Sequence, residues 1–259
     1  MLSSLLLVES GDGVATLTLN RPDFMNALNG KLRQTLTEAF RDIASGGNTR
    51  VVILTGAGSA FCAGMDLKEA AAVPLNRAAF SGEADVIGAM GAFEGPIIGA
   101  INGHAITAGF ELALACDIRI ASTEAKFADT HVRVGMLPGW GLSQRLPRLI
   151  GIGRAKELSL TGNFITAAQA EAWGLVNGVV PPDQLLPACQ KLAADIASCD
   201  PSVIASYKRL IDEGFNMSLS DAMAHESKIA KDWANGITSG DIAKNRQQIQ
   251  ARGRQQDHT

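Results

Sequence analysis

Four consecutive apolar residues, Val51-Val52-Ile53-Leu54, constrain the fold of this chain more than any other feature. Turn-forming residues bound the run on both sides, and such a short, wholly apolar segment is typical of a strand whose two faces are both covered. Strands of that kind occur in layered α/β folds, where helices lie against the sheet. The run therefore predicts an α/β protein with a buried, mainly parallel sheet.

The segments around this run repeat the order strand, loop, helix about three times. Alternating and apolar patterns predict strands at 14–19, 51–54, 96–101 and 118–121, with a further short strand at 126–127. Helical spacing predicts helices at 26–44 and 75–93 and one that begins near Ala108. Residues 55–64 are small and predict a loop, and the N-terminal residues predict a first strand rather than a signal peptide. Right-handed crossovers are favoured between such strands, so function is expected in loops at strand ends.

The chain changes character after residue 150, where the strand patterns fade. Capping residues, prolines and glycines predict helices at 166–174, 200–214 and 218–233. We therefore divide the chain into a core of residues 1–195 and a helical region of residues 196–259. Helices with wide apolar faces at a chain end pack either on a partner subunit or within their own chain.

Composition excludes several classes of function. The 259 residues are 46% hydrophobic and 19% charged with a net charge of −3, which fits a globular protein and gives no basic surface for nucleic acid. No segment is long and apolar enough for a membrane span. The cysteines are Cys62, Cys116, Cys189 and Cys199. They lack metal-ligand spacing and disulfide density, which predicts reduced, mostly buried thiols of a cytoplasmic protein with no metal site.

One short segment combines two groups that a reaction through an enolate needs. Residues 98–107 predict a strand and a small-residue turn, and the next helix begins near Ala108. The free N–H groups of a first helical turn can stabilise an oxyanion. Glu111, three residues further on, shares that helix face and can act as acid or base. Its neighbours are apolar, so we expect burial to raise its pKa.

Two further segments can complete a site. Small residues at 61–64 permit close approach of a ligand, beside which the N–H of Met65 can serve as a second donor. Taken alone, such a loop is more often a simple turn. His131 lies in a predicted loop after a strand and before the stiff turn at Pro138-Gly139. A lone loop histidine is more often structural or exposed than catalytic.

Five ordered motifs resemble those of the enoyl-CoA hydratase/isomerase (crotonase) superfamily over nearly the whole chain. They are Asn20-Arg21-Pro22 with Asn26-Ala27-Leu28, residues 61–68, residues 102–118, residues 135–146, and Leu160-Thr161-Gly162. A single glycine pattern is common, whereas five motifs in the family's order are specific. The resemblance implies a spiral of ββα turns followed by a C-terminal helical region that assembles homotrimers or hexamers made of two trimers.

The resemblance also implies the ligand and the site. The substrate is an acyl-CoA thioester, no cofactor is needed, and the thioester oxygen binds between the N–H groups of Met65 and Ala108. Hydratases of the family use two glutamates, of which the first matches Glu111 and the second falls on His131. The substrate and CoA contacts extend over several loops. They carry over to Met25, Ala27, Leu28, Ala63, Met65, Asp66, Leu67, Lys68, Ile106, Ala108, Pro138 and Gly139.

Three functions stay open at this point. The leading hypothesis is hydration of 2-enoyl-CoA thioesters, with Glu111 as base and His131 as the acid or the group that orients water. A second is another enolate reaction, namely Δ3,Δ2-isomerisation, decarboxylation or retro-aldol cleavage, which the histidine at the second glutamate position motivates. A third is an acyl-CoA-binding protein that lacks catalysis.

Overall fold

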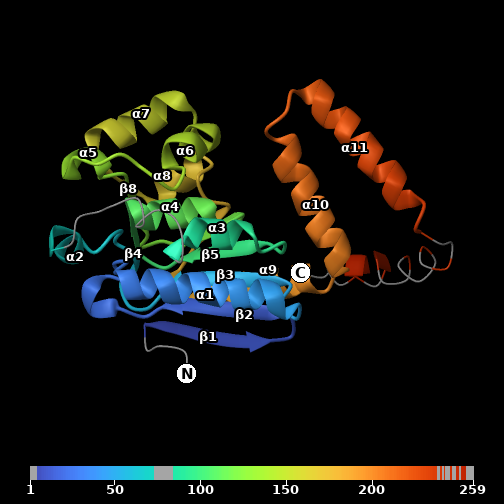
Figure 1. Ribbon diagram of the computed structural model, residues 1–259, viewed down its shortest axis with the longest axis horizontal. Coiled ribbons are helices and arrows are strands. Elements are labelled where there is room, and N and C mark those ends of the chain that lie inside the picture. Colours follow the sequence, from blue (N-terminus) through green and yellow to red (C-terminus); the bar gives the residue numbers. More distant parts are fainter. Residues whose placement is uncertain are drawn as a thin grey trace. The chain divides into compact units, whose positions relative to one another are not determined.

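The computed structural model describes residues 5–72 and 84–237, with isolated positions up to 254 (Figure 1). The chain forms two compact units, Met1–Ala205 and Ser206–Thr259. The expected division into residues 1–195 and 196–259 concerns domain roles and stays a prediction. Among the described helices, none is both long and apolar enough to cross a membrane.

Short elements alternate along most of the chain. The strands are β1 (Leu6–Gly11), β2 (Val14–Leu19), β3 (Val51–Gly56), β4 (Ala60–Cys62), β5 (Ile97–Ile101), β6 (His104–Ile106), β7 (Ile118–Ser122), β8 (Lys126–Ala128), β9 (Phe164–Thr166) and β10 (Gly178–Val180). The α-helices are α1 (Gly30–Gly46), α2 (Leu67–Ala72), α3 (Val86–Gly91), α4 (Ala108–Ala115), α5 (His131–Val134), α6 (Leu142–Ile150), α7 (Ile152–Thr161), α8 (Ala167–Ala172), α9 (Leu185–Ala197), α10 (Pro201–Gly214) and α11 (Leu219–Ala234). Two 3-10 helices are η1 (Pro22–Phe24) and η4 (Pro182–Gln184).

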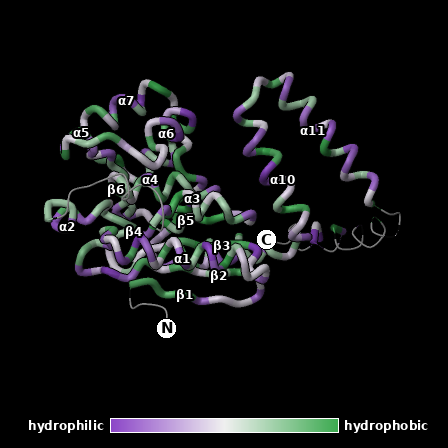
Figure 2. The backbone as a smooth tube through the Cα atoms, viewed as in Figure 1, coloured by the Kyte–Doolittle hydropathy of each residue, from purple (hydrophilic) through white to green (hydrophobic). Residues whose placement is uncertain are grey.

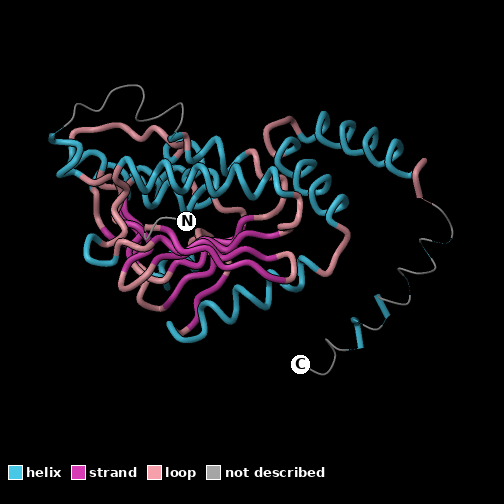
Figure 3. The backbone as a smooth tube through the Cα atoms, turned by 60° about the horizontal axis from the view of Figure 1, so that its bottom comes forward, coloured by secondary structure: helices cyan, strands magenta, loops and turns pink. Residues whose placement is uncertain are grey.

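A six-stranded sheet of order β1-β2-β3-β5-β7-β10 lies at the centre of the first unit, between helices (Figure 3). Its pairs are parallel except for the antiparallel β1 and β2. Val52 and Leu54 of β3 belong to the main hydrophobic core, whereas Val51 and Ile53 pack with buried residues of α9 in a second core. The prediction that residues 51–54 form a strand covered on both faces is confirmed.

A second sheet of order β4-β6-β8-β9 explains how the chain coils. β3, β5 and β7 each lead into a short strand of this sheet and then into a helix, so the core repeats a ββα turn. Three expectations were wrong: residues 55–64 contain β4, the turn before Ala108 contains β6, and β9 and β10 follow residue 150. These strands have three residues each, too few for an alternating pattern to be recognised.

The helix boundaries follow the capping residues. α1 begins at Gly30 rather than at residue 26, because Met25 and Asn26 have positive φ values of 49° and 56° and Asn29 caps the helix. α8 starts with the predicted cap at Thr166, which forms a capping box. The remaining boundaries at Asp200-Pro201 and Ser218 are also confirmed. Of the helix predicted at 75–93, residues 75–83 lie outside the described part, and α3 accounts for the remainder.

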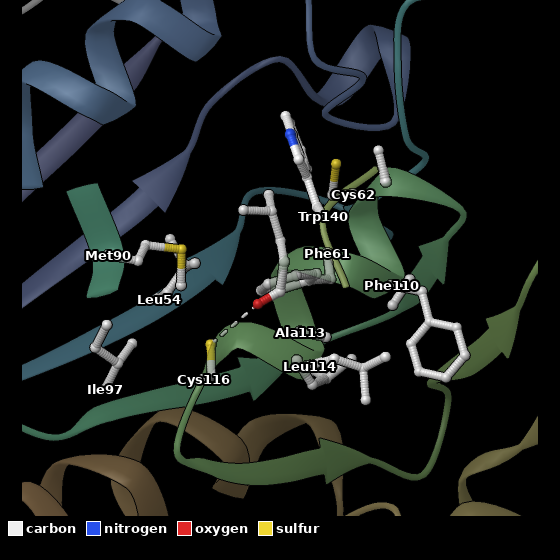
Figure 4. Close-up of a cluster of buried hydrophobic side chains, with 14 of the residues drawn as sticks. Leu54, Phe61, Cys62, Met90, Ile97, Phe110, Ala113, Leu114, Cys116 and Trp140 are labelled. Carbon is white, nitrogen blue, oxygen red and sulfur yellow. Dashed lines mark hydrogen bonds between the residues drawn. The ribbon is translucent and has the colours of Figure 1, made fainter. Parts of the chain in front are cut away.

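α4 is almost entirely buried, and its apolar side chains lie among those of neighbouring strands (Figure 4). A β-carbon on Gly109 would come within 2.0 Å of the carbonyl oxygen of Cys62, so the helix backbone lies directly against β4. In Figure 2 the tube of β5, which lies beside α4, has the colour of hydrophobic residues. The contact between Gly109 and Cys62 sets the start of α4 beside the loop that follows β4.

The second unit contains the end of α10 and the whole of α11. His225 Nε2 on α11 lies 2.7 Å from Glu213 Oε2 on α10, which ties the two helices together. Large apolar side chains are exposed on both helices and between them. They include Tyr207, Ile211, Phe215, Leu219 and Met223, each more than half exposed.

Candidate functional site

One pocket in the first unit gathers the residues that the sequence marks for chemistry. Loops after β4, β6 and β8, together with the segment between α5 and α6, supply its walls. The lining residues are Ala63, Met65, Leu67, Thr107, Ala108, Glu111, Thr130, His131, Val134, Met136, Leu137 and Trp140. Most of this lining is apolar, so charges inside the pocket interact more strongly than they would in water.

Ala108 opens α4, and its N–H belongs to the first turn, where helical amides have no partner within the helix. The preceding residue, Thr107, has φ 53°, a rare value for a β-branched side chain. Its own N–H donates to Ala128 O at 2.9 Å. Strained backbone of this kind concentrates at functional sites, and here it turns the chain sharply just before the Ala108 amide.

Met65 lies beside this turn. Leu28 N donates to Gly64 O at 2.7 Å and Leu28 O accepts from Asp66 N at 3.1 Å, so this parallel bridge engages the residues on either side of Met65 and not its N–H. A β-carbon on Gly64 would come within 3.5 Å of Ala108 N. The Met65 and Ala108 amides are therefore neighbours on one wall of the pocket.

Glu111 is 2% exposed. Its Oε1 accepts from Trp140 N at 2.7 Å and from Leu142 N at 3.2 Å. Burial raises the pKa of the carboxyl above its ordinary value, although the two backbone donors oppose that change. The expected raised pKa is confirmed, and because Oε1 is already engaged, Oε2 is the oxygen left to exchange a proton.

His131 is the first residue of α5 and is 6% exposed, so the expectation of a loop position and of an exposed ring was wrong, whereas the choice between a structural and a catalytic role stays a prediction. Its Nε2 lies 3.8 Å from Glu111 Oε2, and its Nδ1 lies 2.7 Å from Asp129 Oδ1. A distance of 3.8 Å is too long for a direct hydrogen bond, but a water ~2.8 Å from each atom fits the span. The two groups therefore face each other with room for one small molecule.

Asp129 is the main site residue that the sequence interpretation missed. It is 2% exposed. Burial alone raises the pKa of its carboxyl, but hydrogen bonds from His131 and Ser159 outweigh burial and leave the pKa lower than usual. Residues two apart on an extended segment share a face, so the Asp129-x-His131 spacing after a predicted strand was the available signal.

The pocket also gains residues that carried no recognisable signal alone. Thr107 and Thr130 face each other with their Oγ1 atoms 2.5 Å apart. Val134, Met136, Leu137 and Trp140 supply apolar surface. The indole Nε1 of Trp140 is buried and makes no hydrogen bond to any residue that the structure describes.

Among the predicted substrate and CoA contacts, Ala63 and Leu67 line the pocket together with Met65 and Ala108. The others lie outside its lining, and their role stays a prediction. Met25 O accepts from Ala63 N, Ala27 O accepts from Arg21 Nη1, Leu28 is fully buried, and Asp66 pairs with Arg21 at 3.1 Å. Lys68 lies exposed on α2, Ile106 ends β6, and Pro138 and Gly139 precede Trp140.

The described residues hold no metal-binding geometry. Within them, no group of three or more His, Cys, Asp or Glu side chains is arranged to hold a metal ion. The three titratable groups that meet around the pocket, Glu111, His131 and Asp129, lie in a line rather than converging on one point.

Comparison with known proteins decides the family. Residues 9–245 match the family model described as enoyl-CoA hydratase/isomerase. The chain belongs to this family. The predicted membership of the crotonase superfamily and the predicted ββα fold of this enoyl-CoA hydratase/isomerase are thereby confirmed.

Relatives of this chain match it over most of their length. An Arabidopsis thaliana protein named "Probable enoyl-CoA hydratase 1, peroxisomal" is 42% identical over 250 residues, which are 95% of this chain and 92% of that protein. The short-chain-enoyl-CoA hydratase of Clostridium acetobutylicum is 37% identical, covering 86% of this chain and 87% of that protein. The crystal structure of enoyl-CoA hydratase from Bacillus anthracis is 37% identical with a TM-score of 0.85, covering 96% of both chains.

Proposed function

We propose that this protein is an enoyl-CoA hydratase, which adds water across the α,β double bond of a 2-enoyl-CoA thioester. The observation that carries the proposal is the pair of buried groups, Glu111 Oε2 and His131 Nε2, that face each other 3.8 Å apart in an apolar pocket. Family membership and relatives named as enoyl-CoA hydratases support it.

The proposed reaction uses protein groups and the substrate's own thioester. Glu111 Oε2 takes a proton from water, and the oxygen of that water forms a bond to Cβ. The π electrons move toward the thioester oxygen, where the N–H groups of Met65 and Ala108 stabilise the enolate. As the carbonyl re-forms, Cα takes a proton from Nε2 of His131, which is a cation before this step and keeps its Nδ1 proton afterwards. Proton transfer between the two groups then restores the starting state.

The facing pair favours hydration over the other enolate reactions. Hydration needs one group for the water and one for Cα, and Glu111 and His131 can both reach a molecule between them. A double-bond shift needs a single acid/base group. In a double-bond shift, one of Glu111 and His131 would then have no catalytic role, although both are buried in the same pocket.

Turnover of crotonyl-CoA and of longer 2-enoyl-CoAs tests the proposal, with Glu111→Gln as the decisive variant. The amide keeps an oxygen for Trp140 N and Leu142 N but cannot take a proton, so kcat should fall ~10²- to 10⁴-fold. A wild type that does not hydrate any of these substrates would refute the proposal. Mass spectrometry of a panel of acyl-CoAs separates the alternatives, since isomerised, decarboxylated or cleaved products point to other enolate chemistry.

A protein that binds acyl-CoA without turnover predicts a different result. His131→Glu would then restore the second carboxylate and create hydration that the wild type lacks. We expect the opposite, namely that the wild type is active and that His131→Glu gives no gain, because Asp129 is placed to pair with an imidazole and would repel a carboxylate.

The proposal also covers the CoA contacts, the assembly and the location of the protein. CoA contacts are assigned to the predicted loop residues, and the helical region 196–259 is assigned to contact between copies of this chain. The exposed side chains of Tyr207, Ile211 and Phe215 support a homotrimer or a dimer of trimers, which light scattering coupled to size exclusion measures directly. The reduced cysteines support a cytoplasmic location, which a tagged copy in cells tests.

A further inference from the structure

We propose that Asp129 is a positioning residue that fixes the ring of His131, so that Nδ1 carries a proton and Nε2 is directed at Glu111. This inference rests on the proposed hydration for its kinetic readout, but its structural part does not depend on the reaction.

The carboxylate of Asp129 contacts His131 at two atoms, the ring nitrogen Nδ1 and the backbone nitrogen. Asp129 Oδ1 lies 2.7 Å from the ring nitrogen Nδ1 and also accepts from the backbone N of His131 at 3.3 Å. Backbone and ring are therefore held by the same oxygen. An imidazole whose Nδ1–H donates to a carboxylate has a defined tautomer and a defined ring orientation.

Asp129 itself is held from a second element. A side-chain hydrogen bond from Ser159 on α7 joins the one from His131, and the carboxyl is almost fully buried. A buried carboxylate with two hydrogen-bond donors stays ionised. Asp129 therefore accepts a hydrogen bond from Nδ1–H of His131 and has no proton of its own to donate. The side-chain hydroxyl of the next residue, Thr130, forms a hydrogen bond with that of Thr107, which directly precedes Ala108. This contact connects the segment that holds Asp129 to one of the two proposed oxyanion donors.

The charged groups that face His131 come from two elements. Glu111 approaches Nε2 from α4, and Asp129 approaches Nδ1 from the segment between β8 and α5. Ser159 from α7 adds a hydroxyl and no charge. Each ring nitrogen thus faces one carboxylate at different distances, 3.8 Å and 2.7 Å, and the shorter contact is the one that sets the ring.

The first experiment needs no variant. The ¹⁵N spectrum of the wild-type protein with its histidine rings neutral should show Nδ1 of His131 with the shift of a protonated nitrogen and Nε2 with that of an unprotonated one. The reverse pattern would overturn the proposal, whether or not the protein hydrates enoyl-CoA.

The second experiment separates positioning from a purely structural role. Asp129→Asn should lower kcat ~10- to 10²-fold with KM within about twofold, and the exposed Asp183→Asn is the matched control. In a His131→Gln background, Asp129→Asn should cause no further loss, because residues that act through one another are non-additive. An equal loss in both backgrounds, or an unchanged kcat in Asp129→Asn, would show that Asp129 does not act through His131.

Ser159→Ala covers the case in which Asp129→Asn fails to fold. It leaves the carboxylate in place but removes one donor, and we expect a smaller loss of kcat with the same ¹⁵N signature. Loss of that signature together with full activity would contradict the proposal.

Discussion

Gly64 lies so close to Ala108 that a β-carbon on Gly64 would come within 3.5 Å of the Ala108 amide nitrogen and 2.9 Å of Ile106 O. Gly64 also has φ +98°, a conformation that side chains rarely adopt. The residue before one proposed oxyanion donor is thus glycine because Ile106 O leaves no room for a β-carbon and because the backbone is left-handed there.

Gly64→Ala should therefore damage the site as well as the backbone. The matched control is Gly47→Ala, since Gly47 has φ +68° and no atom of the described residues lies within 4 Å of an added β-carbon. Both changes should cost ~1–2 kcal/mol of unfolding free energy for the left-handed backbone. Only Gly64→Ala should also lower kcat/KM for an enoyl-CoA, by at least about tenfold. Equal activity in the two variants would show that the reaction tolerates displacement of the Met65 and Ala108 amides.

The raised pKa of Glu111 predicts how its contribution to stability depends on pH. In the unfolded chain the carboxyl titrates near its ordinary value of 4.5, whereas in the folded chain it titrates higher. Between these two values the folded state binds more protons, so the contribution of Glu111 is greatest below 4.5 and falls as the pH rises through the folded pKa.

Glu111→Gln removes this titration. Relative to wild type, the variant should gain unfolding free energy between pH 4 and pH 8, as measured by denaturant titration at several pH values. Glu157→Gln, at an exposed position on α7, serves as the control. A Glu111→Gln difference that stays constant with pH, or declines as the pH rises, would mean that burial does not govern this carboxyl.

Arg119 should be one of the most costly side chains to remove outside the site. It is 7% exposed and donates to Leu175 O at 2.7 Å and to Cys116 O at 2.6 Å. Arg119→Met leaves two buried carbonyls without these donors and should cost ~3 kcal/mol. Arg148→Met, the same change on the exposed side of α6, should stay within ~0.5 kcal/mol. Similar unfolding free energies for the two variants would contradict this view.

The cysteines should differ sharply in reactivity. Burial raises the pKa of Cys62, Cys116 and Cys189 to about 12, so these thiols hold almost no thiolate at neutral pH. Cys199 is exposed. A chromogenic disulfide reagent should modify one thiol quickly in the native protein and all of them after denaturation. Cys199→Ser should abolish the fast phase, and a fast phase that persists would place a buried thiol within reach of solvent.

The sequence predicted the long elements and the principal reactive groups, because those depend on local patterns. The run from Val51 to Leu54 and the helix start at Ala108 were predicted correctly, since apolar runs and small-residue turns are patterns of a few neighbouring residues. The sequence did not predict β4, β6, β9 and β10, because strands of three residues depend on their partners in the sheet.

The site residues followed the same rule. Glu111 was expected to be buried because its own helix is apolar, and it is. Asp129 was missed because its role is defined by the ring of His131 and the hydroxyl of Ser159, and Ser159 lies 30 positions away in the sequence. Trp140 N and Leu142 N were missed since a backbone donor leaves no mark in the residue type.

The two backbone donors to Glu111 lie where the segment after α5 enters α6, with Trp140 just before the helix and Leu142 as its first residue, so proton affinity at the site is coupled to the position of this helix start. Any movement that carries Trp140 and Leu142 away from the carboxylate removes the contacts that oppose burial and drives its pKa further up. The base would then hold a proton and could not accept one from water. A displacement of this buried helix start would thus switch the reaction off electrostatically, with no change in the residues that carry it out.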